Sequence, residues 1–391
     1  MRSATAIFQF IIFLSIFLIS YATLHFYFYV KCVKTLRFFE IHRLGFIIVL
    51  AFLLFSPVFL NIIHNYRTGF WGYSFSYFGY LWMAFVFLFF SIHISIDFLT
   101  RLVAFLNTRI PLSISSISWF AGRQPVFFSS LFLVLTILVY GHFEVRNIRI
   151  ERISLVTVLM PPELDKFRIV QISDLHFSII NKKELAEKIA RQINQLEPDL
   201  VVCTGDIIDR GLQDEAAVIA RLNTIKAPYG KYAVTGNHEF YTGIAKATAF
   251  ITQAGFKMIR NQAYPIADWI HLAGVDDPAG RNFQSASNPQ EAEILKNIPS
   301  GKMIILLKHQ PMVNAGSRDL FFLQLSGHIH KGQIFPFSLI TALLYRYHSG
   351  YFELSSKTYL YVSRGTGSWG RPIRFLSPPE ITVIDIINKQ P

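Results

Sequence analysis

The sequence has few charged residues and few cysteines, and each scarcity excludes a class of protein. Charged residues make up 16% of the 391 residues, against about 25% in ordinary soluble domains. The two cysteines, Cys32 and Cys203, fall in segments of different character, so we expect no disulfide between them. No Cys-x-x-Cys pair occurs, which excludes a zinc site built from paired thiolates.

A basic stripe is also missing, although the net charge is +12. Residues 1–147 hold ten Lys or Arg and three Asp or Glu, so +7 of this charge lies in the first part of the chain. There the cations lie in the gaps between apolar runs, as they do in the loops of membrane proteins. The rest is spread over the remaining residues without clustering. We therefore expect no nucleic-acid partner.

Hydrophobic residues are abundant instead, at 52% of the chain, and they gather before residue 143. A helix needs about 20 apolar residues to cross the hydrocarbon core of a bilayer. Four stretches qualify, near Ala4–Tyr29, Leu44–Ile63, Tyr77–Phe98 and Pro125–Phe143. We predict an all-α transmembrane helix bundle over residues 1–143 of an integral, multi-pass membrane protein. The first stretch is longer than a signal-peptide core, so we interpret it as a retained helix.

The polar residues of these stretches and the flanking cations bear on the role and orientation of the bundle. His25, His93 and Asp97 lie near the predicted span ends, which favours polar ends of an anchor over a transport path. Four spans would place the amino terminus and the second half of the chain on one side. Lys and Arg are slightly fewer on that side, which favours the outside of the cytoplasm. The counts are five (Arg2, Arg67, Arg146, Arg149, Arg152) against seven (Lys31, Lys34, Arg37, Arg43, Arg101, Arg109, Arg123).

Residues 148–391 follow a different pattern, in which short apolar runs alternate with amphipathic stretches. The runs at 167–172, 200–203, 232–235, 266–275, 303–307 and 322–325 are predicted strands. Residues 182–196, 213–225 and 245–254 have the apolar spacing of helices. Strands that alternate with helices indicate a layered α/β domain with a largely buried sheet.

Five short polar segments follow predicted strands in this second half. They are Asp174-Leu175-His176, Gly205-Asp206-Ile207-Ile208-Asp209, Gly236-Asn237-His238-Glu239, His309, and Gly327-His328-Ile329-His330. One such segment alone is typical of a turn or a helix cap, but five in order after strands indicate a shared site. On extended chain, residues two positions apart point to the same face, so Asp174 and His176 should enter one pocket, as should His328 and His330. Oxygen and imidazole ligands without thiolate suit Mn, Fe or Zn.

These segments resemble the ordered signature of the calcineurin-like metallophosphoesterase superfamily. The details ISDLH, TGNHEFY, SGHIHKGQ and YVSRGTGSWG are similar to its YkuE-like, membrane-attached branch, and the resemblance covers residues 148–388. It implies a four-layer α/β/β/α sandwich and two divalent metal ions. It implies one ion held by Asp174, His176, Asp206 and His330, the other by Asp206, Asn237, His309 and His328, and His238 as the catalytic residue that faces the substrate. Lys331 stands where relatives usually have glycine.

The resemblance implies a membrane-anchored phosphoesterase that uses a metal-bridging hydroxide on a phosphate ester, phosphodiester or pyrophosphate. The membrane bundle favours a phosphorylated substrate that is associated with the membrane, and a lipid-linked substrate is one case of this. Two alternatives stay open: a lipid-linked nucleotide pyrophosphatase of the UDP-diacylglucosamine type, and a receptor or transporter with a metal-binding sensor domain.

Three further features have two interpretations each. Arg364 and Arg371 suit contact with a substrate phosphate or a structural role. The apolar run 335–347 suits a core helix or a segment that dips into the bilayer surface. Asp209 and Glu239 are expected to orient neighbouring ligands rather than to bind metal. The oligomeric state is left open by the sequence.

Overall fold

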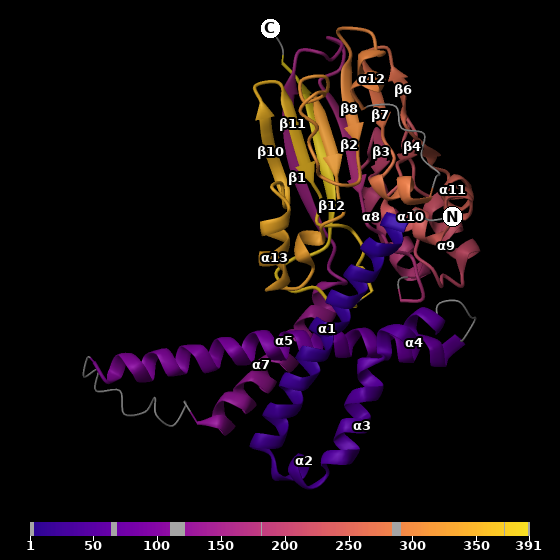
Figure 1. Ribbon diagram of the computed structural model, residues 1–391. Helices are drawn as coiled ribbons and strands as arrows, with labels where there is room; N and C mark the ends of the chain where they lie inside the picture. Colours follow the sequence, from indigo (N-terminus) through magenta and orange to yellow (C-terminus); the bar gives the residue numbers. More distant parts are fainter. Residues whose placement is uncertain are drawn as a thin grey trace. The chain divides into compact units, whose positions relative to one another are not determined.

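The computed structural model describes residues 4–63, 69–109, 122–180, 182–283, 291–370 and 372–389. The chain divides into two compact units, a helical unit within Ser3–Phe143 and a mixed α/β unit within Glu144–Pro391. Figure 1 shows helices alone in the first and two stacked sheets with flanking helices in the second. Each unit is described by itself.

The helical unit contains six described helices. They are α1 (Ala4–Thr35), α2 (Arg37–Ile41), α3 (Arg43–Leu54), α4 (Ser56–Ile63), α5 (Gly69–Asn107) and α7 (Arg123–Glu144). Among the described residues, three segments are long and apolar enough to cross a membrane, namely Leu14–Thr35 of α1, all of α5 and all of α7.

The second predicted span, Leu44–Ile63, is not one continuous helix in the structure. The helix is interrupted at Phe55, which separates α3 of 12 residues from α4 of 8 residues. Pro57 explains the break, because proline has no N–H for the helical hydrogen bond to residue 53 and its ring crowds the preceding turn. Neither piece alone reaches the length that a span requires.

Contacts between helices show that α3 runs opposite to α1. The hydroxyl of Tyr21 lies 3.4 Å from the carbonyl oxygen of Leu53, and the Tyr29 ring lies 5.8 Å from the Phe46 ring. Residues later in α1 thus meet residues earlier in α3. Helix α3 therefore returns the chain along α1, and α4 packs against α5.

Helix α5 runs in the same sense as α1. Three contacts follow in the same order along both helices. Trp82 Nε1 donates to His25 Nε2 at 2.9 Å, the Tyr27 hydroxyl lies 2.9 Å from His93 Nδ1, and Lys31 Nζ lies 3.9 Å from Asp97 Oδ2. The polar residues His25, His93 and Asp97 therefore all have partners inside the helical unit, as expected for an anchor bundle whose helices are joined by polar contacts. Helix α7 runs opposite to α5. His142, late in α7, contacts Tyr77, early in α5, whereas Phe127, early in α7, contacts Phe89, further along α5.

The α/β unit contains two six-stranded sheets. The first has the order β1 (Arg149–Thr157), β12 (Glu380–Asn388), β2 (Lys166–Ile172), β3 (Leu200–Cys203), β4 (Lys231–Ala233), β5 (Lys257–Met258). The second has the order β10 (Gly350–Ser355), β11 (Thr358–Val362), β9 (Leu323–Ser326), β8 (Met303–Leu307), β7 (Ile270–Gly274), β6 (Gln262–Ala267). The helices are α8 (Lys183–Gln195), α9 (Glu215–Asn223), α10 (Asn237–Thr242), α11 (Ile244–Gln253), α12 (Glu291–Lys296) and α13 (Phe337–Leu344).

Alternating side chains of β2 and β8 show how the layers stack. Phe167 and Ile169 of β2 pack with Ile305 of β8 in a core between the sheets. Val170 of β2 instead packs in a core with side chains of α8, α9 and α11, and Leu306 of β8 packs in a third core with side chains of α12. Because successive side chains of a strand point to opposite faces, each sheet has one face on its partner sheet and one on helices. The predicted four-layer α/β/β/α sandwich is confirmed.

One predicted strand, 266–275, is in fact a hairpin. Strand β6 ends at Ala267, Asp268 and Trp269 form the turn, and β7 begins at Ile270. Trp269 is buried in the core between the sheets, so an apolar residue at the turn hid the break from the sequence pattern. The predicted helices 182–196, 213–225 and 245–254 match α8, α9 and α11 to within two residues at each end.

Parallel pairing brings the polar segments to one edge of the stacked sheets. Strands β2, β3 and β4 pair in parallel, and so do β7, β8 and β9. The carboxyl ends of parallel strands lie at the same edge of a sheet, which is where sites of layered α/β proteins form. Asp174, Asp206, Asn237, His309 and His328 each follow one of these strands within a few residues.

Candidate metal centre

The predicted ligands lie just beyond the strand ends, in a backbone conformation that the sequence did not predict. The φ angles are +55° at Asp174, +48° at His176, +53° at Asp206, +75° at His328 and +52° at His330. The expectation that Asp174 with His176, and His328 with His330, share a face of extended chain is therefore wrong. Left-handed residues turn the chain tightly, and this strain is typical of functional sites.

Two glycines allow these loops to approach one another closely. A Cβ atom on Gly236 would collide with the carboxylate of Asp206, and one on Gly327 would collide with Ser173 and Asp174. The backbone N–H of His328 reaches the Asp174 carboxylate at 3.1 Å through this space. Glycine at both positions is thus required by the close packing of the loops.

Asp174, His176 and His330, which we call the first cluster, aim three ligand atoms at one point. The Nε2 atoms of His176 and His330 are 3.0 Å apart, and His330 Nε2 is 3.3 Å from Asp174 Oδ1. All three side chains are buried. Two imidazole nitrogens that face each other around a carboxylate oxygen form an arrangement suited to a cation.

Asp206, Asn237, His309 and His328, which we call the second cluster, lie beside the first. His309 Nε2 is 3.2 Å from Asp206 Oδ2 and 3.2 Å from His328 Nδ1. Asp206 Oδ2 is also 3.8 Å from His176 Nε2, so this carboxylate faces both clusters. Asn237 Oδ1 is buried and meets no hydrogen-bond partner among the residues that the structure describes, which is unusual unless a ligand completes it.

The far side of three histidine rings is held by a hydrogen-bond partner. His309 Nδ1 donates to the carbonyl oxygen of Thr204 at 2.7 Å, and His176 Nδ1 lies 3.1 Å from Asp209 Oδ1. His328 Nε2 lies 3.1 Å from the Tyr345 hydroxyl. These contacts fix the rings so that the opposite nitrogen faces the cluster, as is usual for histidines that bind metal.

The charge states of Asp174, His328 and His330 fit cation binding. Burial lowers the pKa of His309, but the Asp206 carboxylate outweighs burial and raises it, so a cation would displace a proton from this ring. Burial raises the pKa of Asp174, so the buried carboxylate lacks sufficient positive charge around it. Burial lowers the pKa of His328 to about 3, and burial together with the guanidinium of Arg374 lowers the pKa of His330. Both imidazoles are therefore neutral at pH 7 and have a lone pair for a metal. The donor set and the orphaned Asn237 oxygen fit divalent cations.

Glu239 holds two of the ligand loops together. Its carboxylate accepts hydrogen bonds from the backbone N–H groups of Gly236 at 2.6 Å, Asp206 at 3.0 Å and Ile207 at 2.7 Å. The side chain is fully buried. It contacts the backbone rather than the clusters, in agreement with the expected supporting role.

His238 lies beside both clusters. Its Nδ1 is 2.6 Å from Asp209 Oδ1, and its ring centroid is 4.7 Å from that of His176. Burial lowers the pKa of His238, but the carboxylates of Asp209 and Asp206 outweigh burial and raise the pKa to about 10. His238 is therefore protonated at neutral pH, and Asp209 occupies Nδ1, which leaves the Nε2–H as the available donor.

Three residues near the site were not predicted from the sequence. Tyr345 contacts His328 as described, the buried Arg374 lies 3.0 Å from His330 Nδ1, and the exposed Trp369 ring lies 6.0 Å from the His238 ring. Tyr345 and Arg374 belong to none of the quoted motifs, whereas Trp369 is the tryptophan of YVSRGTGSWG, a segment that did not indicate contact with His238. Asp209, by contrast, lies in the recognisable segment 205–209.

The structure bears on one of the two arginines that could contact a substrate phosphate. Arg364 pairs with Glu380 at 2.6 Å and with Glu151, which supports the structural interpretation. Arg371 lies outside the described residues. Recognition of a substrate phosphate therefore cannot be assigned to Arg364.

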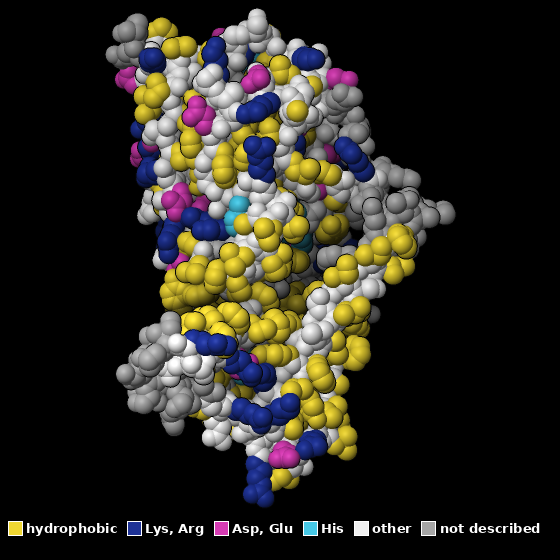
Figure 2. Space-filling view, turned by 60° about the vertical axis from the view of Figure 1, so that its left-hand side comes forward, with side chains coloured by type: hydrophobic (Ala, Val, Ile, Leu, Met, Phe, Trp, Pro, Cys, Tyr) yellow, Lys and Arg dark blue, Asp and Glu magenta, His cyan; other side chains and the backbone are white. Residues whose placement is uncertain are grey.

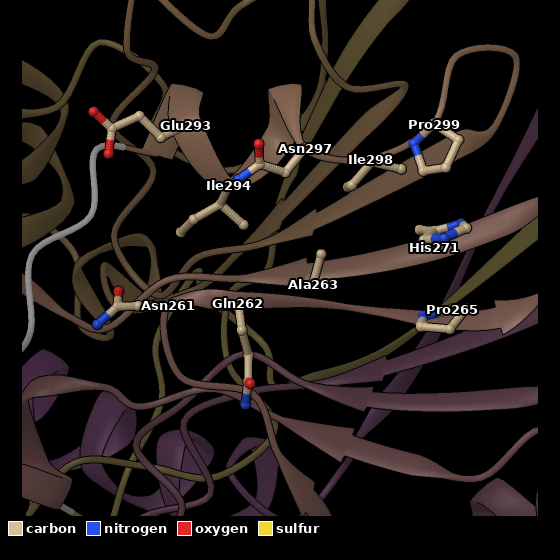
Figure 3. A pocket seen from close by; sticks show the side chains of 10 residues that line it. All are labelled: Asn261, Gln262, Ala263, Pro265, His271, Glu293, Ile294, Asn297, Ile298 and Pro299. Carbon is tan, nitrogen blue, oxygen red and sulfur yellow. The ribbon is translucent and has the colours of Figure 1, made fainter.

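A pocket of about 470 Å³ lies apart from these clusters. Figure 3 shows side chains of β6, β7, α12 and the segment after α12 around it, among them His271 and Glu293. Its lining includes none of the predicted metal ligands. The clusters, not this pocket, bring together the groups that carry chemistry.

The stacked sheets, together with the clusters of Asp and His side chains that could hold metal ions, define the class of metal-dependent hydrolases. The calcineurin-like phosphoesterase family matches residues 167–332. An uncharacterized metallophosphoesterase of Aquifex aeolicus is 33% identical over 260 residues, which cover 66% of this chain and 99% of the relative. The chain belongs to the calcineurin-like metallophosphoesterase family, as its motifs indicated, and is a phosphoester hydrolase.

Two further relatives support this assignment. The uncharacterized metallophosphoesterase YkuE of Bacillus subtilis is 38% identical over 240 residues, which cover 58% of this chain and 82% of YkuE. A transmembrane protein with metallophosphoesterase domain of Bos taurus is 33% identical over 239 residues, which cover 57% of this chain and 53% of that protein. The chain thus spans about half the length of the bovine relative.

Proposed function

We propose that the protein is a multi-pass membrane phosphoesterase whose centre holds two divalent cations, Mn, Fe or Zn. One observation carries the proposal: two histidine pairs have facing ring nitrogens at 3.0 and 3.2 Å, and the Asp206 carboxylate faces both pairs. One cation would bind the first cluster and Asp206. The other would bind the second cluster.

The chain's own residues then have distinct roles in the hydrolysis. When bound, a pair of divalent cations supplies an activated water and neutralises charge on a phosphoryl group. His238 holds a proton at Nε2, from which it can protonate the leaving oxygen or stabilise the charge that develops on it. Asp209 keeps His238 protonated and oriented through Nδ1. Ser173, which donates to Asp174 at 2.5 Å, and Glu239 hold the loops that carry the ligands.

The substrate proposed is a phosphate ester, phosphodiester or pyrophosphate located at a membrane. The apolar helices of the same chain support this, because they keep the site close to a bilayer. A transport role is not supported, because the polar residues His25, His93 and Asp97 pair within the helical unit.

We further propose that the amino terminus and the catalytic unit lie on the same side of the membrane. The senses of α1, α3, α5 and α7 alternate, which supports four crossings. Counting Lys and Arg over four crossings favours the outside of the cytoplasm for the catalytic unit. A UDP-diacylglucosamine-type pyrophosphatase would need the opposite side.

Hydrolysis by the full chain in lipid nanodiscs tests the function. Bis(p-nitrophenyl) phosphate, p-nitrophenyl phosphate and a nucleotide-linked lipid would be compared, each with added Mn. We expect Asp206→Asn to reduce turnover of whichever is cleaved to background, because this carboxylate faces both clusters.

A matched control and a second readout make this test decisive. Asp214 is an exposed aspartate at the start of α9 without a side-chain cap hydrogen bond, so Asp214→Asn should hydrolyse like the wild type. Metal analysis of the purified proteins should show less bound metal in Asp206→Asn than in the wild type, and an unchanged amount in Asp214→Asn. Full turnover by Asp206→Asn would refute the site assignment.

A further inference from the structure

Helix α13 exposes a face of large apolar side chains. Leu339, Ile340, Leu343 and Leu344 are 56%, 47%, 88% and 73% exposed, whereas Thr341 is buried. Spacings of one, four and five residues place the four on one face of a helix. The interpretation of 335–347 as a core helix is therefore wrong, and this face needs a partner outside the chain's own core.

Cations and an aromatic residue flank α13 in the sequence. Arg346 follows α13 and is exposed, Lys331 precedes it, and Phe335 is 37% exposed. In Figure 2, yellow apolar side chains gather below the histidines drawn in cyan, and dark blue Lys and Arg side chains lie beside them. An apolar helical face with flanking cations is the composition of helices that lie in the headgroup region of a bilayer.

Both ends of α13 are attached to the loop that carries His328 and His330. At the start of the helix, a Cβ atom on Gly332 would lie 2.5 Å from the backbone of Ser338, so the helix packs directly on the turn after His330. At the end, the Tyr345 hydroxyl lies 3.1 Å from His328 Nε2. The position of α13 and the position of these histidines are therefore linked.

A short connection keeps the catalytic unit near the bilayer. The last long apolar helix, α7, ends at Glu144, and β1 begins at Arg149. The residues between them can span roughly 15 Å at most. A lipid surface is thus always within reach of this unit, whereas no soluble partner has such a guaranteed proximity.

We propose that α13 inserts its apolar face into the surface of the bilayer that the chain's own helices span. This places the metal centre at the headgroup level, where it would act on phosphoesters that remain in the membrane. The docking rests on the helix face and the short connection. Its consequence for catalysis rests on the proposed function.

Probes in the full chain, reconstituted in liposomes, test the docking directly. Cys32 and Cys203 are both buried, so Leu343→Cys can be labelled selectively with an environment-sensitive fluorophore. Val158→Cys is the matched control, because Val158 is 71% exposed and follows β1 at its end remote from α7. We expect spin-labelled lipids to quench the probe at 343 and to leave the probe at 158 unquenched.

Two results would overturn the proposal. One is equal, weak quenching at both positions. The other is protection of the probe at 343 that depends on protein concentration and not on lipid, which would show that a second copy of the chain covers α13. Both can be read without any hydrolysis, so they remain decisive if the proposed function fails.

A charge substitution tests the consequence for catalysis. Leu343→Glu removes the burial of one leucine, so we expect roughly a tenfold loss of turnover for a phosphodiester embedded in vesicles. Turnover of soluble bis(p-nitrophenyl) phosphate should stay unchanged, which also shows that the variant folds. Val158→Glu should change neither rate. Equal rates for Leu343→Glu and wild type on the embedded substrate would contradict the proposal.

Discussion

Asp209 contacts two histidines of the site at once. Its Oδ1 lies 3.1 Å from His176 Nδ1 and 2.6 Å from His238 Nδ1. Burial alone would raise the pKa of Asp209, but the two imidazoles lower it. The carboxylate is therefore ionised at neutral pH, so one negative charge orients a candidate ligand and keeps the neighbouring His238 protonated.

Asp209→Asn should lower kcat by about 10- to 100-fold, as loss of a partner of a metal-site histidine typically does. The amide has no charge, so the pKa of His238 should fall from its raised value. Because the role proposed for His238 needs the protonated ring, the loss of kcat at alkaline pH should begin at a lower pH than in the wild type. The pH profile of kcat measures this shift.

Two outcomes distinguish this role from a merely structural one. Asp209→Glu retains the charge and should recover part of the alkaline activity, although its longer side chain places the charge differently. An alkaline limit that does not move in Asp209→Asn would show that Asp209 does not control the proton on His238.

At the scale of elements, the junction between α13 and the turn after His330 depends on one glycine. Gly332 has a φ angle of +74°, and a Cβ atom there would lie 2.5 Å from Ser338 N and Cα. Gly332→Ala combines a strained backbone conformation with a collision against backbone atoms. We expect it to displace α13, to lower the thermal unfolding midpoint and to reduce turnover.

Gly301→Ala is the matched control for this prediction. Gly301 has a φ angle of +77°, and nothing lies within 4 Å of the added Cβ atom. Gly301→Ala should therefore lose only the about 1 kcal/mol that a left-handed backbone conformation costs an alanine. The difference between the two variants in unfolding midpoint and turnover isolates the packing of α13. Similar midpoints for both variants would show that α13 does not need its close contact with the turn.

Elements with a clear periodic pattern were predictable from the sequence. The segment 303–307 matches β8, and 182–196 matches α8 to within one residue at each end, because each buries an apolar face with the period of its secondary structure. The order of polar segments after strands predicted which side chains converge. Parallel pairing of neighbouring strands then brings these loops together.

Features that depend on distant parts of the chain were not predictable. The break at Asp268 was hidden because the buried Trp269 continues the apolar pattern through the turn. The left-handed backbone at Asp174 arises from hydrogen bonds between loops, such as that from its N–H to Gly205 O at 2.9 Å. Arg374 reaches His330 across 44 positions of sequence, so no local pattern could reveal it.

For the whole molecule, the senses of the apolar helices bear on the proposal that both ends of the chain lie on the same side of the membrane. Helix α5 would be about 58 Å long, well beyond the roughly 30 Å of a hydrocarbon core, so part of it must extend into the headgroup region or water. Because α5 runs in the same sense as α1, the proposed multi-pass arrangement requires the chain to cross back between them. Among the described residues between them, α3 runs opposite to α1, and α4 follows it after the break at Phe55.

The alternating senses predict that tags at the amino and carboxyl termini become accessible to protease together in sealed membrane vesicles. A third tag, inserted between α5 and α7, should be accessible only from the opposite side and serves as the control for vesicle integrity. If α3 and α4 did not cross, three spans would remain and the two terminal tags would lie on opposite sides. Protection of one terminal tag while the other is cleaved would therefore contradict the crossing by α3 and α4, and it would also reverse the orientation inferred from the count of Lys and Arg.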